Sequence, residues 1–356
     1  MITLGQVGLG QWGPNLLRNF MKVPGSHVRV CCDLDEQALS KIRSSYPELR
    51  TTADYSELLD DAEIDAIVVS ASARSHFALA KAALEHGKHA FVEKPLALHV
   101  EEGEELVRMA RARDVRLMVG HLLLYHPAVQ RLKAYIDQGE LGELRYVHSQ
   151  RLNLGQIRRD ENAMWSLAPH DISVALYLLA QEPVSVSAQG RGFLRAGVHD
   201  LVFLTVEFAN GTLAHCHVSW LDPHKVRCFT VVGSKKMAVF DDMAGREKLR
   251  IFDQGVDFPD VEYGDRHTLR FGDIYSPRID ISEPLYLECL HFVKCIQEGE
   301  TPLTDGENGL AVLRVLAAGQ QSLDRGGEPV LLRPAEEDGK AWRGHHESVE
   351  RRTPGG

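Results

Sequence analysis

The chain has 356 residues, 44% of them hydrophobic and 25% charged, and its formal net charge is −10. This length is enough for a large core and predicts two domains, while the acidic balance gives no basis for binding nucleic acid or an anionic membrane. No leader peptide is recognisable and no apolar run approaches the roughly 18–20 residues that span a bilayer, so a soluble, cytoplasmic protein is expected.

The first predicted elements surround a G-x-G-x-x-G run within residues 7–13. An apolar strand at 2–7 precedes the run, and a helix-like stretch at 12–23 follows it. A second strand at 28–32 ends in Asp33. Strand, glycine run, helix, second strand and terminal acid are together typical of a dinucleotide site. The alternative is a glycine-rich turn with a structural role only.

Each glycine of the run has a predicted role. Gly8 allows the tight turn, Gly10 lets the backbone approach a pyrophosphate, and Gly13 lets the helix pack on the strand. The free N–H groups and the positive end of the helix dipole then attract phosphates.

The acid at position 33 bears on the choice of dinucleotide. Asp33 can accept hydrogen bonds from the adenosine ribose and would repel the 2′-phosphate of NADP. Leu34 follows, with no arginine beside it to bind that phosphate. We therefore predict NAD as the cofactor, while Lys41 and Arg43 on the next helix leave NADP possible.

Strands and helices alternate through the first 120 residues. Strands are predicted at 2–7, 28–32, 65–70, 89–93 and 115–119. The helices between them include Ser75 to His86, which Gly87 closes. This alternation predicts a doubly wound parallel sheet in a domain covering residues 1–121.

After Gly120 the pattern changes to longer alternating strands, which predicts an α+β domain at 122–333 with a mostly antiparallel open sheet. Asn210-Gly211 and Gly233-Ser234 mark two hairpins. The strands are placed at 144–153, 201–208, 212–220, 226–232, 237–240 and 329–332, and the helices at 127–138, 170–179, 284–298 and 306–323. Residues 334–356 have almost nothing to bury, so a disordered tail is expected.

A lysine follows the strand predicted at 89–93. In such sheets ligands bind at the carboxyl ends of the strands, so Lys94 in Glu93-Lys94-Pro95 would lie near a nicotinamide. Its ammonium can stabilise charge that develops on the oxygen of a reacting alcohol. The alternative is a solvated surface lysine.

A histidine follows a proline that fits a helix start. Pro169 would place His170 on the first turn, where the helix dipole disfavours the imidazolium and keeps the ring able to accept a proton. Asp171 would oppose that effect. The alternative is a capping or packed histidine.

Two further groups are candidates for ligand binding. Arg151, Asn153, Arg158 and Arg159 could hold a diphosphate, or could be ordinary surface charge. Tyr125 and His126 fall at the domain junction, where a substrate cleft is expected.

No metal site is expected. His215 and His217 share one face of a predicted strand while Cys216 points to the other, and no further ligand follows at zinc-like spacing. The six cysteines contain no C-x-x-C pair, which favours buried free thiols in a reducing compartment.

The glycine run, Glu93-Lys94-Pro95, the segment from Gly120 to Gly142 and His170 together resemble the Gfo/Idh/MocA family of NAD(P)-dependent oxidoreductases over residues 2–333. The resemblance implies a Rossmann domain, a second domain whose open sheet often forms a homo-oligomer (dimer or tetramer), a nicotinamide facing Lys94, and His170 as acid/base. We expect the cofactor contacts at Gly8, Gly10, Gln11, Trp12, Gly13, Asp33, Ser70, His76, Glu93 and Lys94. We expect the substrate contacts at Tyr125, Arg151, Asn153, Arg158 and Asp171.

One position departs from the family. Members that act on inositol or simple sugars often carry an aspartate four residues before the histidine, where this chain has Ser166, so the Lys–Asp–His form of the mechanism is in doubt. Residues 12–19 and 167–173 more narrowly resemble bacterial nucleotide-sugar 3-dehydrogenases. That resemblance implies NAD-dependent oxidation of the C3 hydroxyl of UDP-N-acetylglucosamine to a 3-keto sugar, which a PLP aminotransferase converts to a 2,3-diamino sugar for lipid A.

Three alternatives to this function stay open. The substrate could be UDP-N-acetylglucosaminuronate, an inositol or a free sugar. The chain could reduce a 3-keto sugar instead, although Asp33 argues against an NADPH-dependent reductase. It could also be a non-catalytic NAD-binding regulator, which would not need Lys94 or His170.

Overall fold

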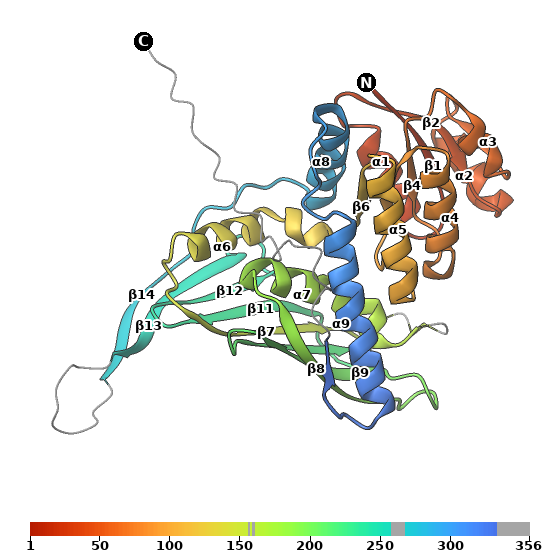
Figure 1. The fold of residues 1–356 in the computed structure, drawn as a ribbon. Coiled ribbons are helices and arrows are strands. Elements are labelled where there is room, and N and C mark those ends of the chain that lie inside the picture. Colours follow the sequence, from red (N-terminus) through yellow and green to blue (C-terminus); the bar gives the residue numbers. More distant parts are fainter. Residues whose placement is uncertain (156, 159–160, 258–267, 333–356) are drawn as a thin grey trace, which may run out of the picture.

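The computed structural model describes residues 1–155, 157–158, 161–257 and 268–332. It contains two sheets, one in each predicted domain (Figure 1). The expected disordered tail at 334–356 lies outside the described residues.

The first sheet has six parallel strands in the order β3-β2-β1-β4-β5-β6. The order reverses between β1 and β4, which defines a doubly wound sheet and confirms the predicted Rossmann fold. The strands are β1 (Ile2–Val7), β2 (Ser26–Cys32), β3 (Arg50–Thr52), β4 (Ala66–Val69), β5 (His89–Val92) and β6 (Leu117–Val119). Strand β3 was not predicted, because its three residues Arg-Thr-Thr at a sheet edge carry no apolar pattern.

The helices of this domain lie between the strands as predicted. They are α1 (Gly13–Phe20), α2 (Glu36–Ser45), α3 (Ser56–Asp60), α4 (Ala73–Glu85) and α5 (Val100–Ala112). Gly87 follows the C-terminus of α4 with φ +71°, a conformation that glycine adopts without strain.

A helix from the C-terminal part of the chain completes the core of the first domain. Helix α8 (Pro284–Glu298) packs against α1 and β1. Its Phe292 meets Phe20 and Phe91 edge-on, with ring centroids 6.2 and 5.6 Å away. Such edge-to-face contacts add to the burial energy of each ring. The chain therefore returns to the first domain at α8, before α9 and β15 complete the second domain.

The second sheet has nine strands in the order β14-β13-β12-β11-β7-β10-β9-β8-β15, and only the β7–β10 pair is parallel. Its strands are β7 (Leu144–Leu152), β8 (Pro183–Arg191), β9 (Leu201–Phe208), β10 (Leu213–Ser219), β11 (Val226–Gly233), β12 (Met237–Asp241), β13 (Leu249–Asp257), β14 (Thr268–Tyr275) and β15 (Val330–Leu331). This confirms the predicted α+β domain with a mostly antiparallel sheet. Strands β8, β13 and β14 were not predicted.

Helices cover one face of this sheet (Figure 1). They are α6 (Pro127–Asp137), α7 (Ala163–Leu179) and α9 (Gly306–Asp324), and a 3-10 turn, η1 (Leu122–Tyr125), precedes them. Helix α9 also packs against α5, so it joins the two domains. Both predicted hairpins, β9–β10 and β11–β12, are present.

The predicted start of the helix that carries His170 was wrong. Helix α7 begins at Ala163, where Asn162 caps it by accepting a hydrogen bond from the N–H of Trp165 (3.1 Å), and Pro169 lies inside the helix. A proline within a helix usually breaks or kinks it, which is why the sequence favoured a start at Pro169. Here a good cap and a long buried apolar stretch outweigh that cost.

All six cysteines are free, and all but Cys228 are buried. Burial raises the pKa of the Cys31 and Cys216 thiols to about 12, because the thiolate loses its hydration. Across the described part of the chain, none of the helices combines the length and the apolar character that crossing a membrane requires.

Candidate active site

The glycine turn at the end of β1 is shaped for a close approach of a ligand. Gly8 has φ +93°, and a Cβ there would lie 2.4 Å from the backbone N of Ala71. A Cβ on Gly13 would lie 2.3 Å from the carbonyl oxygen of Gly8. Gly10 differs, because no atom lies within 4 Å of the place its Cβ would take. The open space at Gly10 beside the N-terminus of α1 fits the pyrophosphate of a dinucleotide.

A buried glutamine, which the sequence analysis missed, supports this turn. The side-chain amide of Gln6 donates to the carbonyl oxygen of Gly13 (2.8 Å) and to Ser70 Oγ (3.1 Å). Ser70 in turn donates to the carbonyl oxygen of Gly8 (2.7 Å). Gln6 stands two residues before the first glycine, and that position on a buried strand was the available signal.

Asp33 lies at the carboxyl end of β2, as predicted. Its carboxylate accepts hydrogen bonds from the backbone N–H of Leu9 (2.6 Å) and of Asp35 (2.8 Å). These bonds hold the acid beside the glycine turn, where it fits a ribose. Arg43, a candidate for a 2′-phosphate, is instead bonded to Glu36 and to Thr51 Oγ1.

The remaining predicted cofactor residues occupy two kinds of environment. Gln11 and Trp12 are exposed on the turn, and the Trp12 side chain also bonds to Glu93. His76 is 1% exposed, and its ring nitrogens lie 2.7 Å from the carbonyl oxygen of Pro95 and 3.1 Å from that of Ala71. His76 therefore supports the loop around Pro95, and neither ring nitrogen is left for a ligand.

Lys94 reaches across to the second domain. Its Nζ donates to the carbonyl oxygen of Ser166 in α7 (3.1 Å). Burial lowers the pKa of Lys94, and the neighbouring Glu93 carboxylate opposes that shift. Glu93 is itself buried, which raises its pKa from 4.5 to about 7. Glu93 is thus buried and Lys94 half-buried at the end of β5, and the charge of each favours the charged form of the other.

His170 lies one turn beyond Ser166 on α7, so both residues are on the same side of the helix. Its Nδ1 is buried and has no hydrogen-bond partner among the described residues. Burial holds the pKa of His170 well below 6.5, and the positive charges of Lys94 and Arg151 add to that effect. The ring is neutral as expected, but the cause is burial and neighbouring cations and not the helix N-terminus.

Asp171 was expected to lie beside His170 and to oppose its neutral state. Instead its carboxylate binds Arg151 at two points, with Nε–Oδ2 at 2.9 Å and Nη2–Oδ1 at 3.0 Å. Successive residues on a helix point about 100° apart, which turns Asp171 towards β7. Arg151 is therefore neutralised inside the protein before any substrate binds.

Two other members of the predicted substrate group lie on the segment after β7. Arg158 is exposed and pairs with Glu161 (2.9 Å). Its positive charge is close enough to lower the pKa of Lys94. The backbone N–H of Asn153 bonds to the carbonyl oxygen of Ser219, which extends the β7–β10 pairing. Arg159 lies outside the described residues.

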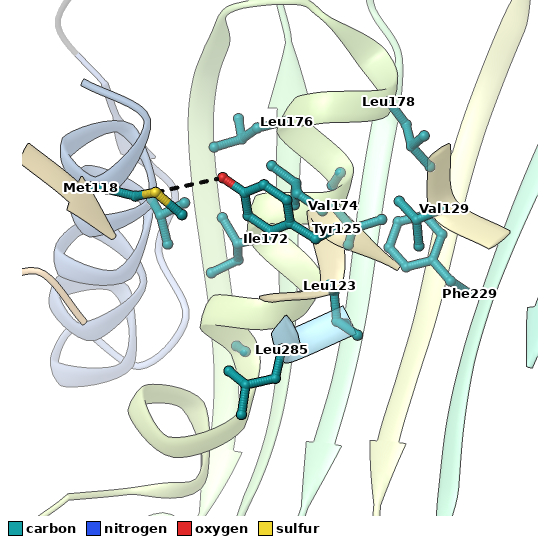
Figure 2. Close-up of a cluster of buried hydrophobic side chains, with 14 of the residues drawn as sticks. Met118, Leu123, Tyr125, Val129, Ile172, Val174, Leu176, Leu178, Phe229 and Leu285 are labelled. Atoms are coloured by element: carbon teal, nitrogen blue, oxygen red, sulfur yellow. Dashed lines mark hydrogen bonds between the residues drawn. The ribbon is translucent and has the colours of Figure 1, made fainter. Parts of the chain in front are cut away.

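Tyr125 does not line a cleft. It is 6% exposed, and its hydroxyl is 2.9 Å from Thr304 Oγ1 and 3.9 Å from the sulfur of Met118. Figure 2 shows the ring among Ile172 and Val174 of α7, with the hydroxyl pointing towards Met118. Next to it, His126 caps α6 by accepting a hydrogen bond from the N–H of Ala128 (3.0 Å). Both are structural residues.

A second buried imidazole, also missed from the sequence, lies near the two candidate catalytic groups. His121 follows Gly120 at the end of β6, and its Nδ1 is 2.8 Å from the side-chain oxygen of Asn308 in α9. Burial lowers the pKa of His121 to about 4, and the charge of Lys94 adds to this. Within the described ranges, no group of three or more His, Cys, Asp or Glu side chains is placed to hold a metal ion.

A doubly wound sheet with an open glycine turn, and a lysine at the carboxyl end of β5 that bonds to the second domain, is typical of a nicotinamide-dependent oxidoreductase. Two family models agree with this: the oxidoreductase family with an NAD-binding Rossmann fold matches residues 2–121, and the GFO/IDH/MocA C-terminal domain matches residues 129–239. The chain belongs to the Gfo/Idh/MocA family, which confirms the predicted resemblance.

Relatives within the family differ in their substrates. The scyllo-inositol 2-dehydrogenase (NAD(+)) of Bacillus subtilis is 27% identical over 342 residues, covering 92% of this chain and 95% of that protein. The UDP-N-acetylglucosamine 3-dehydrogenase of Acidithiobacillus ferrooxidans is 31% identical over 195 residues, covering 54% of this chain and 60% of that protein. A solved structure of the latter enzyme, GnnA, superimposes with a TM-score of 0.77 at 25% identity, covering 91% of this chain and 98% of that one.

Proposed function

We propose that this protein is an NAD-dependent dehydrogenase that oxidises a secondary hydroxyl on a sugar ring, and that its substrate is UDP-N-acetylglucosamine, oxidised at C3. The similarity in fold and sequence to the A. ferrooxidans enzyme supports this choice. The product would be a 3-keto sugar, the form that a PLP aminotransferase accepts when it makes a 2,3-diamino sugar for lipid A. The proposal includes a cytoplasmic homo-oligomer.

One contact carries the proposal. The hydrogen bond from Lys94 Nζ to the carbonyl oxygen of Ser166 (3.1 Å) holds the lysine of the first domain against the helix that carries His170. Lys94 follows β5 at the carboxyl edge of the Rossmann sheet, where a nicotinamide would lie, and its charge is close enough to His170 to lower the pKa of the ring. A reacting hydroxyl at this edge would meet a cation and a neutral base together.

The residues divide the chemistry between them. NAD, when bound, accepts the hydride from the carbon that is oxidised. The neutral imidazole of His170 takes the hydroxyl proton, and its lowered pKa leaves it unprotonated before the reaction. The Lys94 ammonium donates a hydrogen bond to the substrate oxygen and stabilises the negative charge that develops there. Asp171 takes no part, because Arg151 occupies it.

The position of Ser166 favours a nucleotide sugar over an inositol. Ser166 is buried one turn before His170 and provides a carbonyl for Lys94, but its side chain carries no charge. The family resemblance places an aspartate here in many enzymes of inositol and simple sugars. An inositol remains the second candidate, because the B. subtilis relative matches almost the whole chain.

The test is an NADH absorbance assay with UDP-N-acetylglucosamine, UDP-N-acetylglucosaminuronate and scyllo-inositol. UDP-N-acetylglucosamine is expected to give the highest kcat/KM. The variant Lys94→Met is expected to lose turnover and keep NAD binding. Lys81→Met, on the surface of α4, serves as the control. Turnover of scyllo-inositol alone would overturn the proposed substrate assignment. Near-normal activity of Lys94→Met would overturn the proposed mechanism. Absence of turnover with every compound would favour a non-catalytic NAD-binding regulator.

A further inference from the structure

An arginine that neither the motifs nor the proposed mechanism uses lies on the same face of the second sheet as Arg151. Strand β11 runs antiparallel to β7, and Arg227 is directly opposite Arg151 in that pairing. Side chains of directly opposed residues project from the same face of a sheet. Because Arg151 reaches Asp171 on α7, Arg227 also projects towards α7, the helix that carries His170.

A small cavity, with room for about one water molecule, lies between these strands and the helix. Its polar lining comes from Arg151, Asp171, Arg227 and Asp242, and its apolar wall includes Leu123 and Phe229. Asp171, which follows His170 on α7, is part of the lining, so the cavity lies one residue along the helix from the candidate catalytic histidine. The charge of Arg227 also contributes to the lowered pKa of His170.

The charges around this cavity do not balance. Arg151 takes up the carboxylate of Asp171 completely, with both side chains less than a tenth exposed. Asp242 is the remaining acid, and it is shared: its oxygens lie 3.4 Å from Arg227 Nη1 and 3.8 Å from Lys248 Nζ. Three cations thus face two carboxylates.

The nearby imidazole does not alter this balance. His126 Nε2 is 3.8 Å from Asp242, but burial lowers the pKa of His126 to about 4, so the ring is neutral at pH 7. Lys94 is left out of this balance, because the neighbouring Glu93 carboxylate offsets its charge. This local excess of positive charge, in a protein whose net charge is −10, favours the binding of an anion at this part of the surface.

We propose that Arg227 binds an anionic substituent of the substrate, a phosphate or a carboxylate, and that the enzyme thereby selects a charged sugar over a neutral polyol. The inference rests on the proposed dehydrogenase function. The Arg227 side chain is 42% exposed, and its bond to Asp242 is long at 3.4 Å, so the guanidinium can turn to an incoming oxyanion. A guanidinium binds either group through two parallel N–H donors.

Steady-state kinetics of Arg227→Gln test the inference, with Arg227→Lys as the conservative variant. The control is Arg314→Gln, which removes the same charge from a half-buried surface arginine on α9. For the substrate with an anionic group, Arg227→Gln is expected to raise KM roughly 10- to 100-fold with little change in kcat, because it loses a charge-assisted bond. Arg227→Lys should recover part of that loss. Turnover of scyllo-inositol, which is neutral, should stay within about twofold. An equal loss of kcat/KM for neutral and anionic substrates, or no loss for either, would overturn the inference about Arg227.

Binding measurements separate this inference from the proposed function. Isothermal calorimetry on the NAD-saturated protein measures the affinity for UDP and for glucuronate without any turnover. Weaker binding of either anion to Arg227→Gln than to wild type supports the role of Arg227 even if no compound is oxidised. If only UDP binds more weakly to Arg227→Gln, the group that Arg227 binds is a phosphate. If only glucuronate does, the group is a carboxylate. Wild-type protein that binds neither anion, or equal affinities in both proteins, would overturn the inference.

Discussion

Arg151 and Asp171 form a two-point ion pair in the interior, with side chains 9% and 4% exposed. The pair joins β7 to α7 at the residue that follows the candidate catalytic histidine. Asp171 therefore compensates a buried guanidinium, and His170 lacks the carboxylate partner that its neighbour in the chain could have supplied. The ion pair fixes α7 in position and leaves the imidazole neutral.

Breaking this pair is expected to destabilise the fold. Asp171→Asn leaves Arg151 buried without a counterion, and such losses cost about 3–5 kcal/mol. The double variant Arg151→Met/Asp171→Leu should lose less than the sum of the two single changes, since it leaves no buried charge. Urea unfolding of wild type, Arg151→Met, Asp171→Leu and the double variant measures this coupling, and Asp171→Asn is unfolded beside them. Additive losses would contradict the coupling.

Substituting alanine for the last glycine of the run and for the middle one should have different effects. Gly13→Ala places a Cβ 2.3 Å from the carbonyl oxygen of Gly8, so it should lower the Tm by disturbing the turn. Gly10→Ala meets no atom within 4 Å, so the Tm should stay unchanged while NAD binding weakens. Thermal unfolding and NAD titration of both variants test this contrast. Unchanged NAD affinity in Gly10→Ala would show that the cofactor does not pass that position.

Asp33 is expected to set the preference for NAD. Asp33→Ser with Leu34→Arg removes the acid and adds a cation for the 2′-phosphate. The KM for NAD should rise roughly 10- to 100-fold, because a charge-assisted hydrogen bond to the ribose is lost, and the KM for NADP should fall. Since Asp33 also accepts from the N–H of Leu9, the unfolding free energy is measured in parallel. Asp114→Asn, on an exposed turn, is the control. A variant that still prefers NAD would contradict the assignment.

The raised pKa of Glu93 predicts a specific dependence of stability on pH. Its pKa rises from 4.5 in an unfolded chain to about 7 in the folded protein, because burial penalises the carboxylate. Between these values the folded state binds more protons, so the free energy of unfolding should fall as pH rises from 4.5 to 7, by about 3 kcal/mol in total. Glu93→Gln removes this titration and should flatten the profile.

The pKa of Glu288 is shifted in the same direction as that of Glu93. It is fully buried, neither carboxylate oxygen has a partner among the described residues, and its pKa is raised well above 4.5. Glu288→Gln should therefore gain stability relative to wild type as pH rises. Denaturant unfolding at several pH values from 4.5 to 8.5 compares the three proteins. Parallel profiles for wild type and Glu93→Gln would contradict a raised pKa.

Elements with a strong local pattern were predicted correctly, and those without one were missed. The β9–β10 hairpin was found because Asn210-Gly211 separates two alternating strands, and Gly211 has φ +82°. Strand β14 was missed, since its residues are largely exposed and show no buried face. The start of α7 was misplaced because local rules give more weight to Pro169 than to the cap at Asn162.

The sequence by itself determined the features that depend on neighbours in the chain. These are the glycine turn, the acid at Asp33 and the position of Lys94 at the end of a strand, because spacing along one βαβ unit sets their geometry. Only the tertiary structure decided which distant groups meet. The contacts of Lys94 with Ser166 and of Arg151 with Asp171 depend on how α7 packs on the second sheet and where Lys94 of the first domain meets it. No local periodicity encodes that packing. The packing determines which charged groups meet at the site on this common fold.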